Sequence, residues 1–444
     1  MSTTKTLAPT SPLTQSVREK HKEYLFPATI QYYTEPIVFT EGKGLRIRDA
    51  DGNEYLDFFG GILTVSVGHA DDRVNAAIKA QVDRFSHVST LYPTLPVVEL
   101  AERLARLAPG NLKQSYFTAS GTEADETAVM MAELHTGSTE IVALRHGYSG
   151  RSMLAQSLTA HSTWRALPSQ IAGIKHAVSP YCYRCPLHLT YPSCGVACAK
   201  DIEELIRTTT TGRVAGFLAE PIQGVGGFIT PPPEYFEIAV GIIRKHGGVF
   251  ICDEVQTGFG RTGGKMWGIE HWGVEPDIMT MAKGVANGLP LGVTIATPEI
   301  AAALKALTIS TFGGNPVSCA AANATIQIIE EEDLPGNAER MGHLLRGGLE
   351  ELKRRFARNI GDVRGMGLMQ AIELVEDEPA GNRTPAKALT NRVFEEARKR
   401  FLLLGKGGLD GNSFRISPPL TVTRPDVEEA LEILRESLEA AGAK

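Results

Sequence analysis

The sequence has no long apolar run, no excess of positive charge and few cysteines. No stretch of about 18 consecutive apolar residues occurs among its 444 residues, so no segment is expected to span a membrane. The formal net charge is −6, and interspersed charges give no basic surface for nucleic acid. Internal repeats and low-complexity tracts are also absent. With 43% hydrophobic and 22% charged residues, the composition is that of a globular protein with two or three lobes.

The N-terminal segment lacks the apolar core of a secretory signal. Its first acidic residue is Glu19 and it is rich in Ser and Thr, as organellar transit peptides are, but residues 1–20 contain a single arginine. We therefore predict a disordered N-terminal tail on a cytoplasmic protein.

Six cysteines are present, and two of them, Cys252 and Cys319, lie in apolar or small-residue surroundings that predict packing roles. The other four follow the pattern C-x2-C-x8-C-x3-C, at Cys182, Cys185, Cys194 and Cys198. This spacing suits the four thiolate ligands of a structural zinc ion. Two disulfides or four free thiols fit the same spacing, so three interpretations stay open.

Strand-like apolar runs alternate with helical patterns through the middle of the chain. Strands are expected at 114–118, 140–144, 214–221, 248–255, 277–284 and 291–297, and helices at 123–135 and 233–248. Such alternation is typical of βαβ units and predicts an α/β fold with a mostly parallel sheet covered on both faces.

The two ends of the chain have a different pattern. Residues 36–57 predict short hairpins, and the C-terminal part has charged helical patterns at 337–359 and 424–442. Short strand patterns at 367–375 and 413–423 lie between these helices. We predict three parts: an N-terminal segment that forms part of a small domain at 1–65, a large domain at 66–330, and a C-terminal small domain at 331–444.

Chemically active side chains follow two of the predicted strands. Lys283 comes just after "DIMTM", and Asp253 ends "GVFICD". Because ligands of open α/β sheets gather outside the carboxyl ends of the strands, the two side chains are expected to face one ligand. A solvated lysine and an acid that caps a turn are the alternative interpretation.

A phosphate site is predicted at "TASGTEADETA", residues 118–128, where a strand gives way to a helix. Ser120, Gly121 and Thr122 stand at the helix start, where free N–H groups and the helix dipole favour an anion. A plain capping motif would have the same sequence. The glycine-rich stretches "GFGRTGGKM" and "QGVGGF" have neither the P-loop nor the dinucleotide spacing.

A phosphate cradle, a lysine nucleophile and a buried carboxylate together suit pyridoxal phosphate. The lysine amine would form a Schiff base with the cofactor's aldehyde, and the carboxylate would keep the pyridine nitrogen protonated. Burial and neighbouring cations lower the pKa of a lysine, so an apolar strand end is a suitable place for this amine.

The strand-end motifs resemble those of the class III pyridoxal-phosphate aminotransferases of fold type I. The most specific matches are "FICDEVQTGFGRTG" at 250–263 and "PDIMTMAKGVANGLPLG" at 276–292. The resemblance implies a large domain with a mostly parallel seven-stranded sheet, a smaller α+β domain from both termini, and a homodimer or dimer of dimers. It assigns the Schiff base to Lys283 and the pyridine partner to Asp253. Val255 would pack on the ring, with Gln256 near the phenolic oxygen.

Other matched segments imply further contacts with the cofactor. The resemblance places the "SGT" residues Ser120, Gly121 and Thr122 at the phosphate, and Tyr148 of "LRHGYSGRS" on the ring. Ser149 stands where the family usually has histidine. In "STFGGNPVSCA", Thr311 would reach the phosphate of the neighbouring subunit.

The substrate site implied by the resemblance centres on Arg415 in "SFRISPPLTVT", which would clamp a carboxylate. Glu220 of "AEPIQG" would lie beside the cofactor and pair with Arg415 when no carboxylate is bound. Phe58 and Phe59 would shape the pocket walls together with Tyr148.

Several stretches, among them "YLDFFGGILTVSVGHA", are most similar to the alanine–glyoxylate aminotransferase 2 subgroup. The resemblance implies transfer of an amino group from alanine, β-alanine or a 3-aminoisobutyrate-type donor to pyruvate or glyoxylate. A transaminase of 4-aminobutyrate or another ω-amine, a racemase, aminomutase or decarboxylase of the same fold, and a non-catalytic binding protein remain alternatives. Nucleic acid and membrane are not expected partners.

Overall fold

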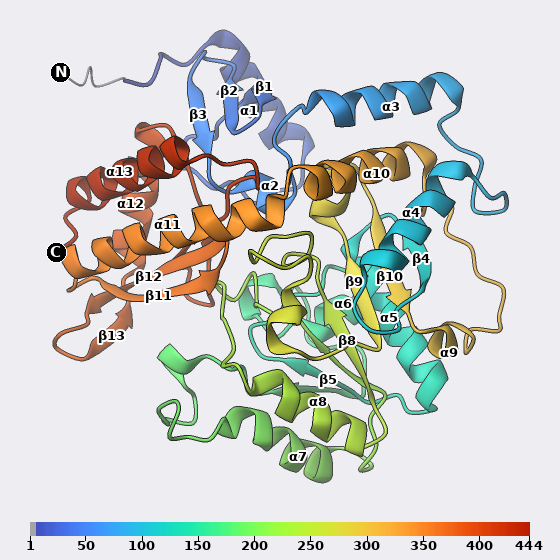
Figure 1. Cartoon of the computed structure of the whole chain (residues 1–444). Coiled ribbons are helices and arrows are strands. Elements are labelled where there is room, and N and C mark those ends of the chain that lie inside the picture. Colours follow the sequence, from blue (N-terminus) through green and yellow to red (C-terminus); the bar gives the residue numbers. More distant parts are fainter. Residues whose placement is uncertain (1–5) are drawn as a thin grey trace.

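A seven-stranded sheet forms the centre of the large lobe (Figure 1). The computed structural model describes residues 6–444 and gives the strand order β4-β10-β9-β8-β7-β5-β6. The strands are β4 Gln114–Thr118, β5 Ile141–Leu144, β6 Ile174–Ala177, β7 Gly216–Ala219, β8 Val249–Asp253, β9 Ile278–Met281 and β10 Gly292–Ala296. Only β10 runs antiparallel to its neighbours, so the predicted mostly parallel sheet is confirmed.

The two faces of this sheet are buried against different helices. Because successive side chains of a strand point to opposite faces, Phe250 and Cys252 join one core cluster while Ile251 joins another. The first cluster contains apolar residues of α7 Ala197–Thr209 and α8 Tyr235–Lys245, and the second contains those of α5 Gly121–Thr136. Burial on both faces explains the continuous apolar runs of these strands.

Short strands near the N-terminus form a separate four-stranded sheet with a strand from the C-terminal part. The predicted hairpins are confirmed as β1 Phe39–Lys43, β2 Arg46–Asp49 and β3 Glu54–Asp57. β3 then pairs in parallel with β14 Leu402–Leu403, so the two ends of the chain build one lobe.

The prediction of a disordered N-terminal tail, made for residues 1–20, is wrong for residues 12–20. They belong to helix α1, Pro12–Tyr24, which begins with Ser11 as its N-cap and Pro12 in the first turn. Thr14 is buried and donates a hydrogen bond of 2.6 Å to Asp51. Capping and docking of this kind offset the low apolar content of the helix. Residues 1–5 lie outside the described range.

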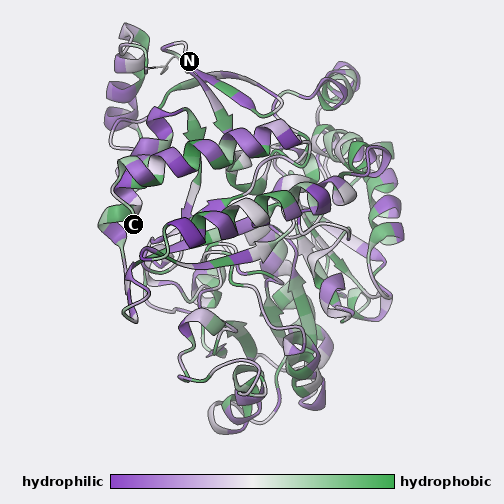
Figure 2. Cartoon of the chain, turned by 60° about the vertical axis from the view of Figure 1, so that its left-hand side comes forward, coloured by the Kyte–Doolittle hydropathy of each residue, from purple (hydrophilic) through white to green (hydrophobic). Residues whose placement is uncertain are grey.

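The C-terminal part forms an α+β lobe. Its sheet has the order β11-β12-β16-β15, and β13 adds to β12. The strands are β11 Ile360–Met366, β12 Met369–Asp377, β13 Asn382–Pro385, β15 Gly405–Gly407 and β16 Ser413–Ile416. The helices are α11 Leu334–Arg355, α12 Lys387–Lys399 and α13 Arg424–Ala440. In Figure 2 the central strands are mostly hydrophobic, whereas α11 and α13 alternate hydrophilic and hydrophobic turns.

The remaining elements connect or cover the two lobes. They are α2 Gly60–Leu63, α3 Asp72–Arg84, α4 Leu95–Leu107, α6 Met153–Leu158, α9 Pro298–Ala301 and α10 Pro316–Glu331, with 3₁₀ turns η1 Ser162–Trp164, η2 Cys182–Arg184, η3 Gly268–Trp272 and η4 Lys283–Ala286. Between residues 6 and 444, none of the helices has the length and apolarity needed to cross a membrane.

Candidate active site

A cavity of about 190 Å³ lies at the carboxyl ends of the central strands. Its lining brings together residues from segments that are far apart in the sequence. They are Gly121, Thr122, Asp125, Tyr148, Ser149, Gly150, Arg151, Glu220, Asp253, Val255, Gln256, Ala282 and Lys283. Most of the predicted cofactor residues therefore share one cavity, at the edge of the sheet where α/β proteins collect their ligands.

Lys283 follows β9 closely and opens the turn η4. Its backbone has φ of +47°, in the left-handed region that side chains other than glycine rarely occupy. The side chain is partly buried, and burial lowers the pKa of its amine, although Asp253 and Glu220 oppose that shift. A buried amine with a lowered pKa is more readily neutral and nucleophilic.

Asp253 is the last residue of β8 and is buried. One of its carboxylate oxygens accepts a hydrogen bond of 2.9 Å from the backbone N–H of Val255. Burial raises the pKa of Asp253 to about 6, while that hydrogen bond and Lys283 favour the ionised form. At neutral pH the cavity therefore contains a carboxylate that can hold a positively charged group.

Asp125 lines the same cavity, although the sequence motifs did not point to it. It is buried and accepts a hydrogen bond of 2.7 Å from the Thr280 hydroxyl. Burial and the charge of Asp253 raise the pKa of Asp125, so it favours the protonated form. The sequence could have indicated Asp125, because it follows Gly121 by four places and residues with this spacing lie on the same face of a helix.

The start of α5, where the sequence predicts a cradle for an anion, forms part of the cavity wall. Gly121 and Thr122 line the cavity, whereas Ser120 is the N-cap, accepts a hydrogen bond from the Glu123 N–H and lies outside the lining. A Cβ added to Gly150 would lie 2.1 Å from the Thr122 hydroxyl, so only glycine leaves this part of the cavity open. Arg151, also missed from the sequence, stands exposed at the same edge.

Tyr148 and Glu220 are joined at another wall of the cavity. Glu220 accepts hydrogen bonds from the backbone N–H groups of Tyr148, at 3.1 Å, and Gly224, at 2.7 Å. Burial and the charge of Asp253 raise the pKa of Glu220 to about 8. The residue after Tyr148, Ser149, is buried and donates its N–H to the Thr159 hydroxyl.

Arg415 lies on β16, and its charge reaches Lys283, where it lowers the pKa of the amine. Its guanidinium stacks 4.9 Å from the ring centre of Phe59 and 5.8 Å from that of Phe228. Nε donates to the Lys406 carbonyl at 3.0 Å and Nη2 donates to the Tyr32 hydroxyl at 3.4 Å. Nη1 is buried and has no hydrogen-bond partner within residues 6–444.

Two predictions about the substrate site need correction. Phe58 is fully buried in the main core, and its neighbour Phe59 contacts Arg415 instead. Glu220 forms no ion pair with Arg415 or any other residue of the described chain. Both of its carboxyl oxygens instead accept the backbone N–H groups of Tyr148 and Gly224.

Thr311 lies apart from the cavity on the connection between α9 and α10, where it is exposed. A role at the phosphate of a neighbouring subunit stays a prediction.

The zinc interpretation of the four clustered cysteines is not supported. All four are free and line one small hollow beside Pro232, with Cys182 exposed and the others partly buried. Within residues 6–444, no group of three or more His, Cys, Asp or Glu side chains is arranged to hold a metal ion.

Comparison with known proteins agrees with this geometry. The sequence profile of the family described as aminotransferase class-III matches residues 29–438. The mitochondrial alanine–glyoxylate aminotransferase 2 homolog 2 of Arabidopsis thaliana is 42% identical and is matched over 97% of this chain and 88% of its own length. A leucine/methionine racemase of Thermococcus litoralis is 36% identical, with 93% of both chains covered.

Solved structures show the same fold. An amine transaminase from an uncultivated Pseudomonas species, in its form with bound pyridoxal phosphate, superposes with a TM-score of 0.88 at 34% identity. The match covers 95% of this chain and 99% of that one. The seven-stranded sheet and the cavity at its edge therefore follow a known architecture.

Proposed function

This chain belongs to the class III aminotransferases, and we propose from that premise that it transfers the amino group of an amino acid or amine to pyruvate or glyoxylate. It is a transaminase that depends on pyridoxal phosphate and has the fold type I architecture. The proposal extends to the roles of its individual residues and to its choice of substrates.

The residues of the cavity fit pyridoxal phosphate. The Gln256 side-chain oxygen is buried without a hydrogen-bond partner within residues 6–444, which leaves an acceptor for the ring hydroxyl. Gly121, Thr122 and the side-chain-free Gly150 leave room for a phosphate at the N-terminus of α5. Lys283 offers the amine for the aldehyde, Asp253 the carboxylate for the ring nitrogen, and Tyr148 an aromatic ring.

When bound, the cofactor supplies an electron sink for the substrate carbon from which a proton is removed. Lys283 accepts and returns that proton at its Nζ. Its lowered pKa favours the uncharged amine, which is the form that can accept a proton. Asp253 stays ionised at neutral pH and would keep the ring nitrogen protonated. Val255 and Tyr148 would pack on the ring and exclude water from it.

The unpartnered Nη1 of Arg415 is the observation that supports a carboxylate substrate. A guanidinium buried between Phe59 and Phe228 without an acid partner in the described chain lacks the charge compensation that buried ions normally have. A substrate carboxylate would provide it through a charge-assisted hydrogen bond. Pyruvate and glyoxylate have such a carboxylate beside the reacting carbon.

The donor is proposed from the relatives. The Arabidopsis thaliana protein is named for alanine and glyoxylate, which supports alanine as the donor here. β-Alanine and 3-aminoisobutyrate-type amino acids are the other donors that the sequence resemblance implies. A racemase among the relatives keeps the same-fold alternative of racemisation open, which a product analysis by chiral chromatography would detect.

Arg415→Ala tests the carboxylate site. Removing one partner of a desolvated charge pair costs about 2–5 kcal/mol, so kcat/KM for pyruvate or glyoxylate should fall by roughly thirtyfold or more. A simple amine donor has no carboxylate and its half-reaction should be nearly unchanged. Stopped-flow measurement of each half-reaction, followed by the cofactor's absorbance, separates the two effects.

The same experiment can reject the assignment. An equal loss in both half-reactions would make Arg415 a structural residue, and no loss in either would place the carboxylate site elsewhere.

Assembly and location are also proposed. We expect a homodimer or a dimer of dimers, with Thr311 of one subunit near the phosphate of the other. A cytoplasmic location stays a prediction, which imaging of the tagged full-length chain in its native cell would check.

A further inference from the structure

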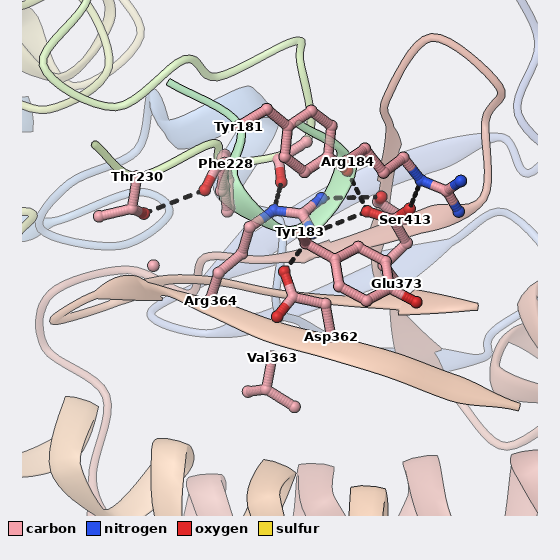
Figure 3. Close-up of polar contacts among 12 residues, drawn as sticks. Tyr181, Tyr183, Arg184, Phe228, Thr230, Asp362, Val363, Arg364, Glu373 and Ser413 are labelled. Atoms are coloured by element: carbon pink, nitrogen blue, oxygen red, sulfur yellow. Dashed lines mark hydrogen bonds and ion pairs between the residues drawn. The ribbon is translucent and has the colours of Figure 1, made fainter. Parts of the chain in front are cut away.

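Arg364 lies at the centre of a buried ion-pair network (Figure 3). Arg364 lies on β11, and its Nη1 donates to Glu373 at 2.7 Å and to Asp362 at 2.8 Å. Its guanidinium also stacks 4.9 Å from the ring centre of Tyr181. None of these residues lines the cofactor cavity.

The charges of this network are retained despite burial. Glu373 is fully buried and also accepts hydrogen bonds from Tyr181 and Arg184. Burial alone would raise the pKa of Glu373, but Arg364 and Arg184 hold it below its ordinary value. Removing one member of such a group would leave a buried charge without its partner, so the geometry is strongly constrained.

The other two nitrogens of Arg364 reach the two segments that enclose Arg415. Nε donates to the Gly227 carbonyl at 2.8 Å, and Phe228, whose ring faces Arg415, is the next residue. Nη2 donates to the Ser413 hydroxyl at 3.1 Å, and Ser413 precedes Arg415 by two places on β16.

The backbone of Gly227 lies close to the side chains of Arg364 and Ser413. A Cβ on Gly227 would lie 3.0 Å from Nη2 of Arg364 and 3.1 Å from the Ser413 hydroxyl, and Gly227 has φ of +94°. One planar guanidinium therefore fixes the Phe228 loop and the Arg415 strand relative to each other. A lysine at position 364 could not replace Arg364, because an ammonium group lacks the planar set of N–H donors of a guanidinium.

We propose that Arg364 is a positioning residue for the carboxylate site: by bonding Gly227 and Ser413 at once it sets the position of the Arg415 guanidinium against Phe228. The inference rests on the proposed carboxylate role of Arg415. Its consequence is selective, since a displaced Arg415 weakens binding of 2-oxo acids while the chemistry at Lys283 and the use of simple amines continue.

The test compares Arg364→Gln and Ser413→Ala with the control Arg346→Gln, all as holoenzymes. Arg346 donates to the carbonyls of Val363, at 2.8 Å, and Gly365, at 2.7 Å, the two neighbours of Arg364 on β11. The control therefore perturbs the same strand without touching Gly227, Ser413 or Glu373. Cofactor absorbance, melting temperature, and kcat and KM of both half-reactions are measured for each variant.

For Arg364→Gln we expect the KM for pyruvate to rise about tenfold or more, because small displacements of a binding group cost that much. The cofactor spectrum and the amine half-reaction should stay within about twofold of wild type. Ser413→Ala removes one charge-assisted hydrogen bond from the guanidinium of Arg364 and should raise the same KM by roughly fivefold or more. Arg346→Gln should lower the melting temperature without a selective change in KM.

Equal losses in both half-reactions for Arg364→Gln and Ser413→Ala, or an identical selectivity change in Arg346→Gln, would overturn the inference. If Arg364→Gln does not fold, Ser413→Ala decides alone. Arg415→Ala measured alongside separates the two hypotheses. If Arg415→Ala selectively loses use of 2-oxo acids but Arg364→Gln and Ser413→Ala do not, only the positioning role of Arg364 is rejected. If Arg415→Ala shows no selective loss, the carboxylate role of Arg415 and the positioning role of Arg364 are both rejected.

Discussion

At the scale of single residues, the strained backbone of Lys283 marks the centre of the site. Its φ of +47° costs free energy in a residue with a side chain, and surrounding structure must offset that cost. The flanking residues Ala282, Gly284 and Val285 are buried, so the turn has little freedom to relax. Lys283 lines the cavity in this conformation.

Glu220 predicts a measurable pH dependence of stability. Because its pKa is raised to about 8 in the folded chain, the folded state binds more protons than the unfolded state between pH values of about 4.5 and 8. Stability contributed by the protonated carboxyl is therefore present below that window and is lost as the pH rises through it. Glu220→Gln should remove this contribution, and thermal unfolding of cofactor-free protein across the window measures it.

The difference between wild type and Glu220→Gln should grow in favour of the variant as the pH rises to 8. Parallel curves for the two proteins would mean that Glu220 is ionised in the folded state.

The sequence predicted which residues gather in the site better than it predicted their individual contacts. Motif spacing located Lys283, Asp253 and Gly121 because each lies at or just after the end of a strand, and strand ends are fixed by topology. Phe58 and Phe59 could not be told apart, since neighbouring residues point to opposite sides and only the tertiary fold decides which side is core. The expected pairing of Glu220 with Arg415 is absent because its oxygens accept the N–H groups of Tyr148 and Gly224, and only the tertiary fold brings these groups together.

At the scale of elements, the proposed cofactor cradle lies at the junction between β4 and α5. The plain capping role is confirmed for Ser120, while the two following residues line the cavity, so one motif does both tasks. The segment at 148–151 closes the cradle from the other side.

Gly150→Ala tests this element. The added Cβ would meet Thr122 at 2.1 Å, and φ of +127° strains any side chain there. We expect the affinity for pyridoxal phosphate, measured by titrating cofactor-free protein, to fall by at least about tenfold. The loss of one contact worth about 1.4 kcal/mol is enough for a tenfold change in affinity.

The matched control is Gly137→Ala at the other end of α5. That glycine also has positive φ, of +69°, but a Cβ there would meet nothing within 4 Å. The control should lose about 1 kcal/mol of stability through backbone strain and keep its cofactor affinity. Equal affinity losses in the two variants would assign the effect to helix stability.

Helix α1 shows why elements at the ends of a chain are hard to predict. Its own sequence is polar, and its stability comes from Asp51, which accepts hydrogen bonds from the Ser11 N–H at 2.8 Å and from Thr14. Contacts between residues about forty places apart are invisible to periodicity, whereas the strands of the central sheet are recognisable by their apolar content.

At the scale of the whole molecule, an exposed apolar patch surrounds the segment of Thr311. Leu91, Tyr92 and Leu95 are each more than 60% exposed, as is Phe312, whose ring lies 5.6 Å from that of His87. Patches of this kind on a protein mark surfaces that bind another protein, and a second copy of the chain is the simplest partner.

We therefore expect a dimer in sedimentation experiments at micromolar concentration, with Thr311 contributing to the partner's site. Lys283→Ala and Thr311→Glu should each be inactive alone. When the two are co-expressed, hybrid dimers contain one site with both native residues, so activity should return to about a quarter of wild type by statistical mixing. An active monomer, or no recovery in verified hybrid dimers, would contradict the shared site.

The assignment of the active site depends most directly on Lys283 as the residue that holds the cofactor. The full-length protein, loaded with pyridoxal phosphate, is reduced with borohydride, digested and analysed by mass spectrometry. We predict a stable phosphopyridoxyl group on the peptide that contains Lys283, because its partly buried amine with a lowered pKa lies in the cavity with Asp253. A label confined to another lysine, such as Lys265, or no label on protein shown to bind the cofactor, would contradict this assignment.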